Sequence, residues 1–240
     1  MLIVLRIVWQ PGKHAMIPPV CVPPVCVDKN VGVASTGGLD LIRLGEEGGM
    51  IEIRIHGRGG QGNVVAAYVL ATAAIGQGLF AQAFPAFGAE RRGAPVAAFV
   101  RIAETPIRRR CQVAQPAFVI IQDETLAVLP DTLAGLASGG GVMINSPRDS
   151  QALVDTFGRA TYTLPATRLS LEALGRPMPN TALLAAFLTL TELLPVAGLK
   201  DALAQRFRGE VLAHNLALVC QVADATPQGI WKELVHAASA

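Results

Sequence analysis

The chain has 240 residues, of which 51% are hydrophobic and only 16% are charged. This length supports one large domain or two small ones with a real hydrophobic core, and the apolar content excludes an intrinsically disordered protein. The 20 basic and 18 acidic side chains give a formal charge of +2. The strong basic excess that is typical of nucleic-acid-binding proteins is therefore missing.

Two apolar stretches could be mistaken for export or membrane signals. Residues 1–9 are apolar, but they are interrupted by Arg6 and lack a basic start and a small-residue cleavage site, so no signal peptide is predicted. Residues 181–199 contain Glu192 and Pro195, which leave too short an uncharged run to span a bilayer. We interpret this stretch as a buried helix ended by Pro195, and we expect a cytoplasmic protein without contact to membranes or nucleic acid.

A boundary in composition lies near residue 50. Glycine and proline make up 12 of the first 49 residues but only 28 of the other 191. Residues 46–49 (EEGG) require a purine-rich codon run that resembles a bacterial ribosome-binding site, and Met50 follows directly. We therefore expect the folded domain to be 50–240. Residues 1–49 are either a translated leader or an unstructured extension, which a mass measurement of the native protein would distinguish.

The periodicity beyond this boundary predicts strands that alternate with helices. Strands are predicted at 51–56, 95–102, 118–122, 141–145 and 160–164. Helices are predicted at 63–76, from Glu124 with Asp123 as its cap, from Ser146-Pro147 toward Phe157, and over most of the chain after Thr167, with breaks at 175–177, Pro195, Gly209 and Pro227. This order predicts an α/β three-layer sandwich with a mostly parallel or mixed sheet and a helical C-terminal part.

A glycine loop connects the first predicted strand to the first predicted helix. Its residues are Gly57, Arg58, Gly59, Gly60, Gln61 and Gly62, which fit the pattern G-x-G-x-x-G. Backbone N–H groups at a helix N-terminus form a favourable site for a phosphate or carboxylate. Arg58 would add a positive charge and Gln61 an amide. The alternative is a tight turn in which only glycine avoids a clash.

A dinucleotide site would require more than the glycine loop. An acidic residue is expected about 20 positions later, at the end of a second apolar strand, to bind the ribose hydroxyls. Residues 80–88 contain no acidic residue, and Glu90 lies in a polar Arg-Arg-Gly context. A free-standing Rossmann-type NAD(P) oxidoreductase is therefore kept only as an alternative.

A second loop is rich in arginine. Arg91 and Arg92 stand between glycines, next to Glu90 and Gly93. An arginine pair in this position would bind an anionic ligand or dock against an acidic partner surface. The alternative is a solvated loop beside an edge strand, where arginine prevents aggregation, and we favour that interpretation for residues 108–110.

The sequence shows no nucleophile motif or metal-site spacing. The histidines and cysteines are His14, His56, His214, His236, Cys21, Cys26, Cys111 and Cys220. No Gly-x-Ser-x-Gly is present, and the cysteine spacing is not that of a zinc site or an iron–sulfur cluster. His56 alone is expected next to the glycine loop, either in the site or as a ring satisfied by the loop backbone. Cys111 follows three arginines but has no identifiable base.

Three segments together resemble the gamma subunit of 2-oxoacid:ferredoxin oxidoreductases, and the pyruvate synthase branch is nearest. They are HGRGGQG at 56–62, FPAFGAERRGAPV at 84–96 and GRPMPNTALLAAF at 175–187. The resemblance extends from about Met50 to about Val222. It implies that this chain is one component of a complex that decarboxylates a 2-oxo acid, expected to be pyruvate, and transfers the acyl group to coenzyme A.

The resemblance also implies partners. Thiamine diphosphate, magnesium and iron–sulfur clusters are expected in the alpha, beta and delta-type subunits, with ferredoxin as the electron acceptor. This chain itself lacks the Gly-Asp-Gly of a thiamine diphosphate site and a cysteine array. An alternative from another class is a non-catalytic assembly module whose loops are docking surfaces.

The resemblance further implies roles for the two loops. The N–H groups of 59–62, with Arg58, would face a phosphate of coenzyme A or a neighbouring subunit. Arg91 and Arg92 would hold a carboxylate or phosphate, or dock the loop. Asn180 precedes an apolar helix and is expected to be its N-cap, a role we favour over ligand binding. We expect both loops to converge on one shared anionic ligand.

Overall fold

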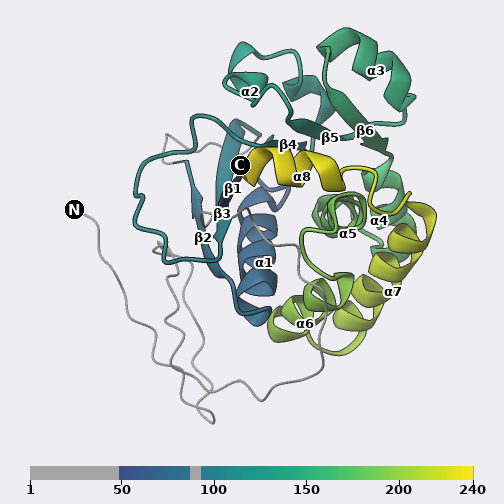
Figure 1. The fold of residues 1–240 in the computed structure, drawn as a ribbon. Coiled ribbons are helices and arrows are strands. Elements are labelled where there is room, and N and C mark those ends of the chain that lie inside the picture. Colours follow the sequence, from purple (N-terminus) through teal and green to yellow (C-terminus); the bar gives the residue numbers. More distant parts are fainter. Residues whose placement is uncertain (1–48, 87–92, 240) are drawn as a thin grey trace.

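A six-stranded mixed sheet forms the centre of the computed structural model, which describes residues 49–86 and 93–239 (Figure 1). The strands are β1 (Met50–Arg58), β2 (Phe80–Pro85), β3 (Pro95–Ala103), β4 (Phe118–Ile121), β5 (Gly141–Asn145) and β6 (Ala160–Leu164). They are ordered β2-β3-β1-β4-β5-β6, with β1, β4, β5 and β6 paired parallel and β3 paired antiparallel with both of its neighbours, β2 and β1. The expected α/β fold is confirmed. The expected extension, apart from Gly49, lies outside the described residues.

Helices cover both faces of this sheet and make the three layers visible in Figure 1. The helical elements are α1 (Asn63–Gly76), η1 (Glu124–Leu126), α2 (Pro130–Leu133), α3 (Ser150–Phe157), α4 (Ala166–Leu174), α5 (Asn180–Thr191), α6 (Val196–Arg206), α7 (Gly209–Ala225) and α8 (Lys232–Ser239). The larger hydrophobic core lies between one face of the sheet and the helices α1 and α5 to α8. A smaller core lies between the other face and the elements η1, α2 and α3.

The central strands show why the sheet needs cover on both faces. In β1, Ile51, Ile53 and Ile55 are fully buried in the larger core. In β4, all four residues are buried, with Phe118 in the larger core and Val119 in the smaller one. A short strand without polar residues is typical of a parallel sheet that is enclosed by helices.

Strand β2 was not predicted from the sequence. This strand pairs antiparallel with β3, from Phe80 opposite Ala103 to Pro85 opposite Ala98. Its alanine-rich sequence has a weak strand pattern, and its terminal proline is tolerated because β2 is an edge strand. The strand that follows α1 is therefore separated from β1 by β3. In a dinucleotide-binding fold this strand would lie next to β1 and would carry the acidic residue that binds the ribose.

Helix α5 is buried along its whole length, as expected, but it ends earlier than predicted. It stops at Thr191, because Glu192 adopts a left-handed conformation with φ of 51°. The Glu192 carboxylate accepts a hydrogen bond from Gln228 at 2.8 Å and pairs with Lys232 at 3.0 Å. Pro195 instead precedes α6 as its N-cap. Among the helices of the described residues, none is both long and apolar enough to cross a membrane.

Two further boundaries differ from the prediction because short polar side chains compete for backbone N–H groups. The helix predicted from residue 146 begins at Ser150, with Asp149 accepting from Gln151 N. The helix predicted after Asp123 is only one 3₁₀ turn, although Asp123 caps it as expected by accepting from Thr125 N at 3.0 Å.

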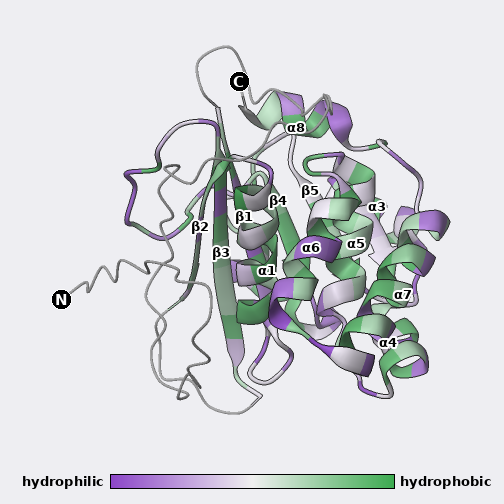
Figure 2. Cartoon of the chain, turned by 90° about the horizontal axis from the view of Figure 1, so that it is seen from below, coloured by the Kyte–Doolittle hydropathy of each residue, from purple (hydrophilic) through white to green (hydrophobic). Residues whose placement is uncertain are grey.

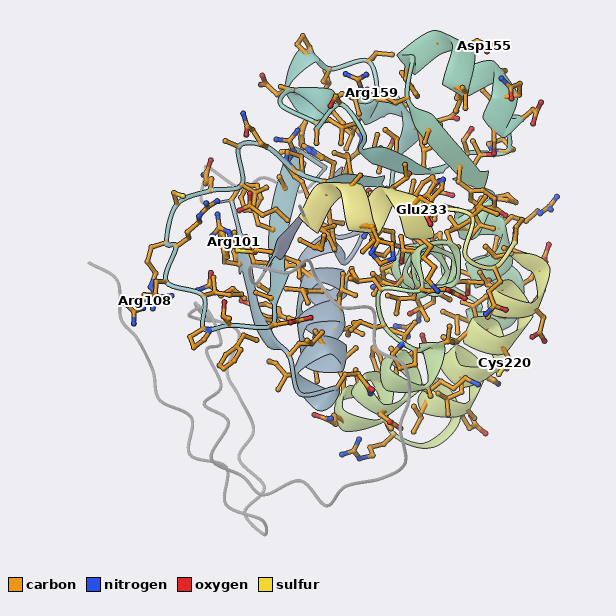
Figure 3. The ribbon with its side chains drawn as sticks, viewed as in Figure 1. Arg101, Arg108, Asp155, Arg159, Cys220 and Glu233 are labelled. Carbon is orange, nitrogen blue, oxygen red and sulfur yellow. The ribbon has the colours of Figure 1, made fainter. Side chains whose placement is uncertain are left out.

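The arginine-rich connection between β3 and β4 is attached to the sheet by a buried ion pair. Arg101 is fully buried, and its Nε lies 2.6 Å from Glu52 Oε1. The same guanidinium donates to the Cys111 carbonyl oxygen at 2.8 Å. Figure 3 shows Arg108 on the outer side of this connection, where its side chain is exposed. Arg101 therefore stabilises the fold, whereas Arg108 is solvated as expected.

Polarity is distributed as the three layers require. Figure 2 shows hydrophobic residues concentrated on the helices that face the sheet, and hydrophilic residues on loops and on outward helix faces. Besides the buried Arg101 of β3, two exceptions lie on β1, where Arg54 and His56 point away from the larger core. Arg54 Nη2 donates to the carbonyl oxygens of Thr132 at 3.0 Å and Ala134 at 2.6 Å, which stabilises α2 over the sheet.

His56 is a neutral ring at neutral pH. Desolvation by burial and the nearby charge of Arg54 lower the pKa of His56 to about 4 from 6.5. Its Nε2 is buried and has no hydrogen-bond partner in the described part of the chain. Protonation of this ring would place a second positive charge beside Arg54, so the native state favours the neutral form.

The stability of the protein should therefore fall in weak acid. Because the unfolded chain binds the His56 proton below pH 6.5 and the folded chain binds it only near pH 4, stability is lost as the pH drops between these values. We expect the free energy of unfolding to fall by about 2 kcal/mol from pH 7 to pH 5 through this residue. Denaturant titrations at both pH values measure the difference. His56→Gln should abolish it, whereas the matched variant His214→Gln, at an exposed histidine, should retain it.

Candidate functional site at the glycine loop

The glycine loop leaves the carboxyl end of β1 and closes on itself. Arg58 N donates to Gln61 Oε1 at 2.7 Å, and Gln61 N donates to Arg58 O at 3.0 Å. Gly60 and Gly62 have φ of 101° and 80°. Both values lie in the left-handed region that favours glycine, which explains why residues 60 and 62 are glycine.

The glycine loop leads directly into α1, and no side chain caps the N-terminus of this helix. Gly62 is the N-cap, and the side chain of Asn63 turns away to donate to Val96 O at 2.8 Å. The N–H groups of the first turn therefore keep the partial positive charge of a helix N-terminus. In the loop itself, Gly59 N donates to Ala94 O at 2.9 Å and Gln61 N is used internally. Of the N–H groups over 59–62 that were expected to face an anion or a neighbouring subunit, these two are therefore bonded within the protein.

Arg58 is held by protein groups. Its Nε lies 2.8 Å from Asp123 Oδ2, Nη2 donates to Thr125 Oγ1 at 2.6 Å, and Nη1 donates to Gly93 O at 3.1 Å. Partial burial acts to raise the pKa of Asp123, but hydrogen bonds from Thr125 and Arg58 outweigh it and hold the pKa below its ordinary value. Arg58 therefore fixes the glycine loop to the end of β4, and much of its charge is neutralised by Asp123.

The second predicted loop meets the first at its described end. Gly93 N donates to Gly59 O at 3.3 Å, next to the bond between Gly59 N and Ala94 O. These bonds continue the pairing of β1 and β3 beyond the strands. Glu90, Arg91 and Arg92 lie outside the described residues, so their roles stay predictions.

The third segment reaches the same place through Asn180. Asn180 Nδ2 donates weakly to Gly62 O at 3.5 Å. A Cβ on Gly62 would lie 2.8 Å from Asn180 Nδ2 and 3.1 Å from Met178 Cε. The start of α5 therefore packs directly against the glycine loop, where the described end of the second segment also lies, at Gly93 and Ala94.

Asn180 is not the N-cap that the sequence indicated. Pro179 occupies that position, and Asn180 is the first helical residue, with its Oδ1 accepting from Thr181 N at 2.9 Å. The proline ring takes the half-helical position ahead of α5, which moves Asn180 one residue inward. The buried amide then serves to join α5 to Gly62.

Polar residues that the sequence analysis did not assign to the site lie at the ends of β4 and β5. The Gln122 side chain is 1% exposed, and neither atom of its amide has a partner among the described residues. Asn145 Nδ2 donates to Gln122 O at 2.8 Å and to Thr167 Oγ1 at 2.7 Å. Ligands of open α/β sheets bind at this carboxyl edge. A polar residue directly after a buried strand was therefore the feature of the sequence that could have identified Gln122 as a site residue.

The described part of the chain contains no group of three or more His, Cys, Asp or Glu residues that could hold a metal ion. Cys111 and Cys220 are both free and exposed, and Figure 3 shows Cys220 on the outer side of α7. The prediction that thiamine diphosphate, magnesium and clusters reside in partner chains stays a prediction.

The fold and the site define an open α/β domain with an uncapped glycine loop at the carboxyl edge of its sheet. Residues 52–225 match the family described as pyruvate ferredoxin/flavodoxin oxidoreductase. The chain therefore belongs to this family, which confirms the resemblance stated from the sequence.

Relatives and solved structures agree with this assignment. Pyruvate synthase subunit PorC of Methanocaldococcus jannaschii is 48% identical over 166 residues, which are 69% of this chain and 91% of that protein. The pyruvate/ketoisovalerate oxidoreductases common subunit gamma of Pyrococcus abyssi is 44% identical over 169 residues, again 69% and 91%. The crystal structure of pyruvate oxidoreductase subunit PORC of Thermotoga maritima is similar with a TM-score of 0.65 and 32% identity, covering 73% of this chain and 96% of that one. The predicted class, a gamma-type subunit of a 2-oxoacid oxidoreductase, is confirmed.

Substitution of Gly62 should test the contact between the loop and α5. Gly62→Ala places a Cβ against Asn180 and forces a left-handed alanine, so we expect the free energy of unfolding to fall by about 2 kcal/mol or more. Gly76→Ala, at the open end of α1, is the matched control and should be neutral or slightly stabilising. Equal effects of the two variants in denaturant titrations would contradict the close approach.

Proposed function

We propose that this chain is the gamma component of a cytoplasmic, multi-subunit 2-oxoacid:ferredoxin oxidoreductase. The complex would decarboxylate a 2-oxo acid, transfer the acyl group to coenzyme A and pass the electrons to ferredoxin. The observation that carries the proposal is the similarity over 166 to 169 residues to gamma-type subunits, of which the chain covers about 91%.

Pyruvate is the proposed substrate of the complex. Several relatives at 46–48% identity are named pyruvate synthase subunits. Others at 42–44% identity are named common subunits of pyruvate and ketoisovalerate oxidoreductases. A gamma chain that serves two substrates in those organisms supports a substrate pocket in other chains, so the gamma chain itself would not select the 2-oxo acid.

The proposal assigns the redox groups to partners. Alpha, beta and delta-type chains would hold thiamine diphosphate, magnesium and the iron–sulfur clusters. Thiamine diphosphate would supply the decarboxylation chemistry when bound there. The described residues of this chain offer no ligand set for a metal, and no step of the reaction is assigned to them.

The role proposed for this chain is the handling of an anion at the glycine loop. The N–H groups of Gly60 and Gly62 have no backbone partner among the described residues, and they lie ahead of the uncapped N-terminus of α1. A phosphate of coenzyme A would accept hydrogen bonds from these donors. Arg58 would act by holding the loop in place through Asp123. Arg91 and Arg92 would supply the free positive charge.

A non-catalytic assembly module is the second candidate. It is supported by the exposed apolar side chains next to η1 and α2, where Val128 is 82% exposed and Leu129 is 39% exposed. Exposed apolar residues that adjoin one another are typical of protein–protein contacts. In that case the two loops would be docking surfaces rather than ligand contacts.

Reconstitution tests the proposal directly. The full chain should co-purify with alpha, beta and delta-type chains, and formation of acetyl-CoA from pyruvate with ferredoxin as acceptor should depend on its presence. A complex that assembles without this chain and keeps full activity would contradict the proposal. Reduction of NAD by the isolated chain would favour the Rossmann-type alternative.

Charge reversal separates ligand binding from docking. Arg91→Glu or Arg92→Glu should raise the apparent KM for coenzyme A about tenfold or more, because each removes a charge-assisted contact to phosphate. Arg108→Glu, at an exposed arginine of the β3–β4 connection, is the matched control and should leave the KM unchanged. A loss of assembly with an unchanged KM would reject the ligand role and support the docking role.

A further inference from the structure

A cleft of about 350 Å³ opens where the ends of several helices meet. The first turn of α1, the connection from α4 to α5, the start of α5, the end of α6 and the start of α7 all contribute to its lining. Figure 1 shows these helices packed together on one side of the sheet. We call this space the arginine cleft, after Arg176 and Arg206 in its lining.

The lining carries positive charge without a counter-charge. Arg176, Arg206 and His214 are exposed, and the residues that line the cleft include no carboxylate. Neither arginine takes part in an ion pair among the described residues, whereas Arg58 and Arg101 do. Two guanidinium groups that line one concave surface without an ion-pair partner in the described part of the chain form a favourable site for an anion.

The floor of the cleft is a buried polar network. Thr181 Oγ1 donates to Asn215 Oδ1 at 2.8 Å, and Asn215 Nδ2 donates to Val211 O at 2.7 Å. Asn180, Thr181 and Asn215 are only 4–7% exposed. Such a network in an otherwise aliphatic helix bundle holds the helix ends in a fixed arrangement, so the cleft is preorganised.

The walls favour an organic ligand. Val65, Leu174 and Met178 supply apolar surface, and Phe207 lies beside the guanidinium of Arg206, with 6.0 Å between Cζ and the ring centroid. A volume of this size lies within the range of small-molecule sites, which combine apolar walls with few polar groups. An inorganic anion would leave this apolar surface exposed to water, whereas an organic ligand would cover it.

We propose that the arginine cleft binds a small organic phosphate. A phosphate monoester carries close to two negative charges near neutral pH, which match the two unpaired guanidinium groups. The phosphate contacts Arg176 and Arg206, and the apolar or aromatic body of the ligand packs on Leu174 and Met178. This site goes beyond the function proposed for the glycine loop, because Asn180 is the only residue that both share.

Calorimetric titration of the full chain tests the proposal. The probes are adenosine 5′-monophosphate and phenyl phosphate, with adenosine and inorganic phosphate as the two separate halves. Both organic phosphates should bind saturably, and each separate half should bind at least about tenfold more weakly, because charge and apolar contact both contribute. The isolated chain is sufficient for this experiment, so its result is independent of reconstitution of the complex.

Three variants locate the binding. The double variant Arg176→Gln with Arg206→Gln should weaken binding of both organic phosphates about tenfold or more. Val211→Glu places a carboxylate at the cleft, at a side chain that is 55% exposed, and should weaken binding without disturbing the core. Arg108→Gln removes one exposed charge on the opposite side of the molecule from α7, as Figure 3 shows, and should change nothing.

Several outcomes would overturn the proposal. They are no saturable binding of either organic phosphate, an equal loss with Arg108→Gln, or unchanged binding in the double variant. If the double variant impaired only co-purification with partner chains and the probes did not bind, the cleft would receive an acidic segment of a partner instead.

Discussion

The arrangement of the whole site depends on one close approach, between Gly62 and Asn180. Any side chain at residue 62 would collide with the Asn180 amide, and the backbone there has a left-handed φ that glycine adopts without strain. This contact joins the parallel strand–helix unit of the first half to the helical second half. The two other segments of the site are attached to the same loop, through Gly59 to Gly93 and through Arg58 to Asp123.

Arginine has two separate tasks in this chain. Arg54, Arg58 and Arg101 donate to carbonyl oxygens or carboxylates of the protein itself, and they hold α2, the glycine loop and the β3–β4 connection to the sheet. A guanidinium used in this way is already paired, so it has little charge left for a ligand. Anion binding would therefore be left to arginines that have no ion-pair partner among the described residues, such as Arg176 and Arg206. Sequence alone does not separate these two groups, because the partners lie 10 to 80 residues away in the chain.

Much of the fold could be predicted from local patterns, and the failures have physical causes. Helix α1 and strand β5 have the predicted boundaries because strong periodicity is bounded by glycine or asparagine. Strand β2 was missed because its pairing with β3, rather than its own composition, makes it a strand. The end of α5 at Glu192 depends on Gln228 and Lys232, which are distant in sequence. Tertiary contacts of this kind override local propensity.

The candidate site was predictable as a set of segments but not as a geometry. The glycine pattern, Gly93 and Asn180 were identified from the sequence, and the structure brings these described residues together. The direction of each polar group was not predictable, since Asn63 turns to Val96 and Arg58 turns to Asp123. Gln122 was read as the last residue of a strand, although its buried amide is without a partner among the described residues.

The first turn of α1 connects the glycine loop with the arginine cleft. Gly62 caps this helix, and Val65, three residues later, lines the cleft. Met178 and Asn180 line the cleft as well, and both would contact a side chain placed on Gly62. A ligand that displaced Met178 or Asn180 would change the space around Gly62, and close packing would transmit this change to the loop. The two surfaces therefore share a wall, and a ligand that moved this wall at one surface would alter the fit at the other.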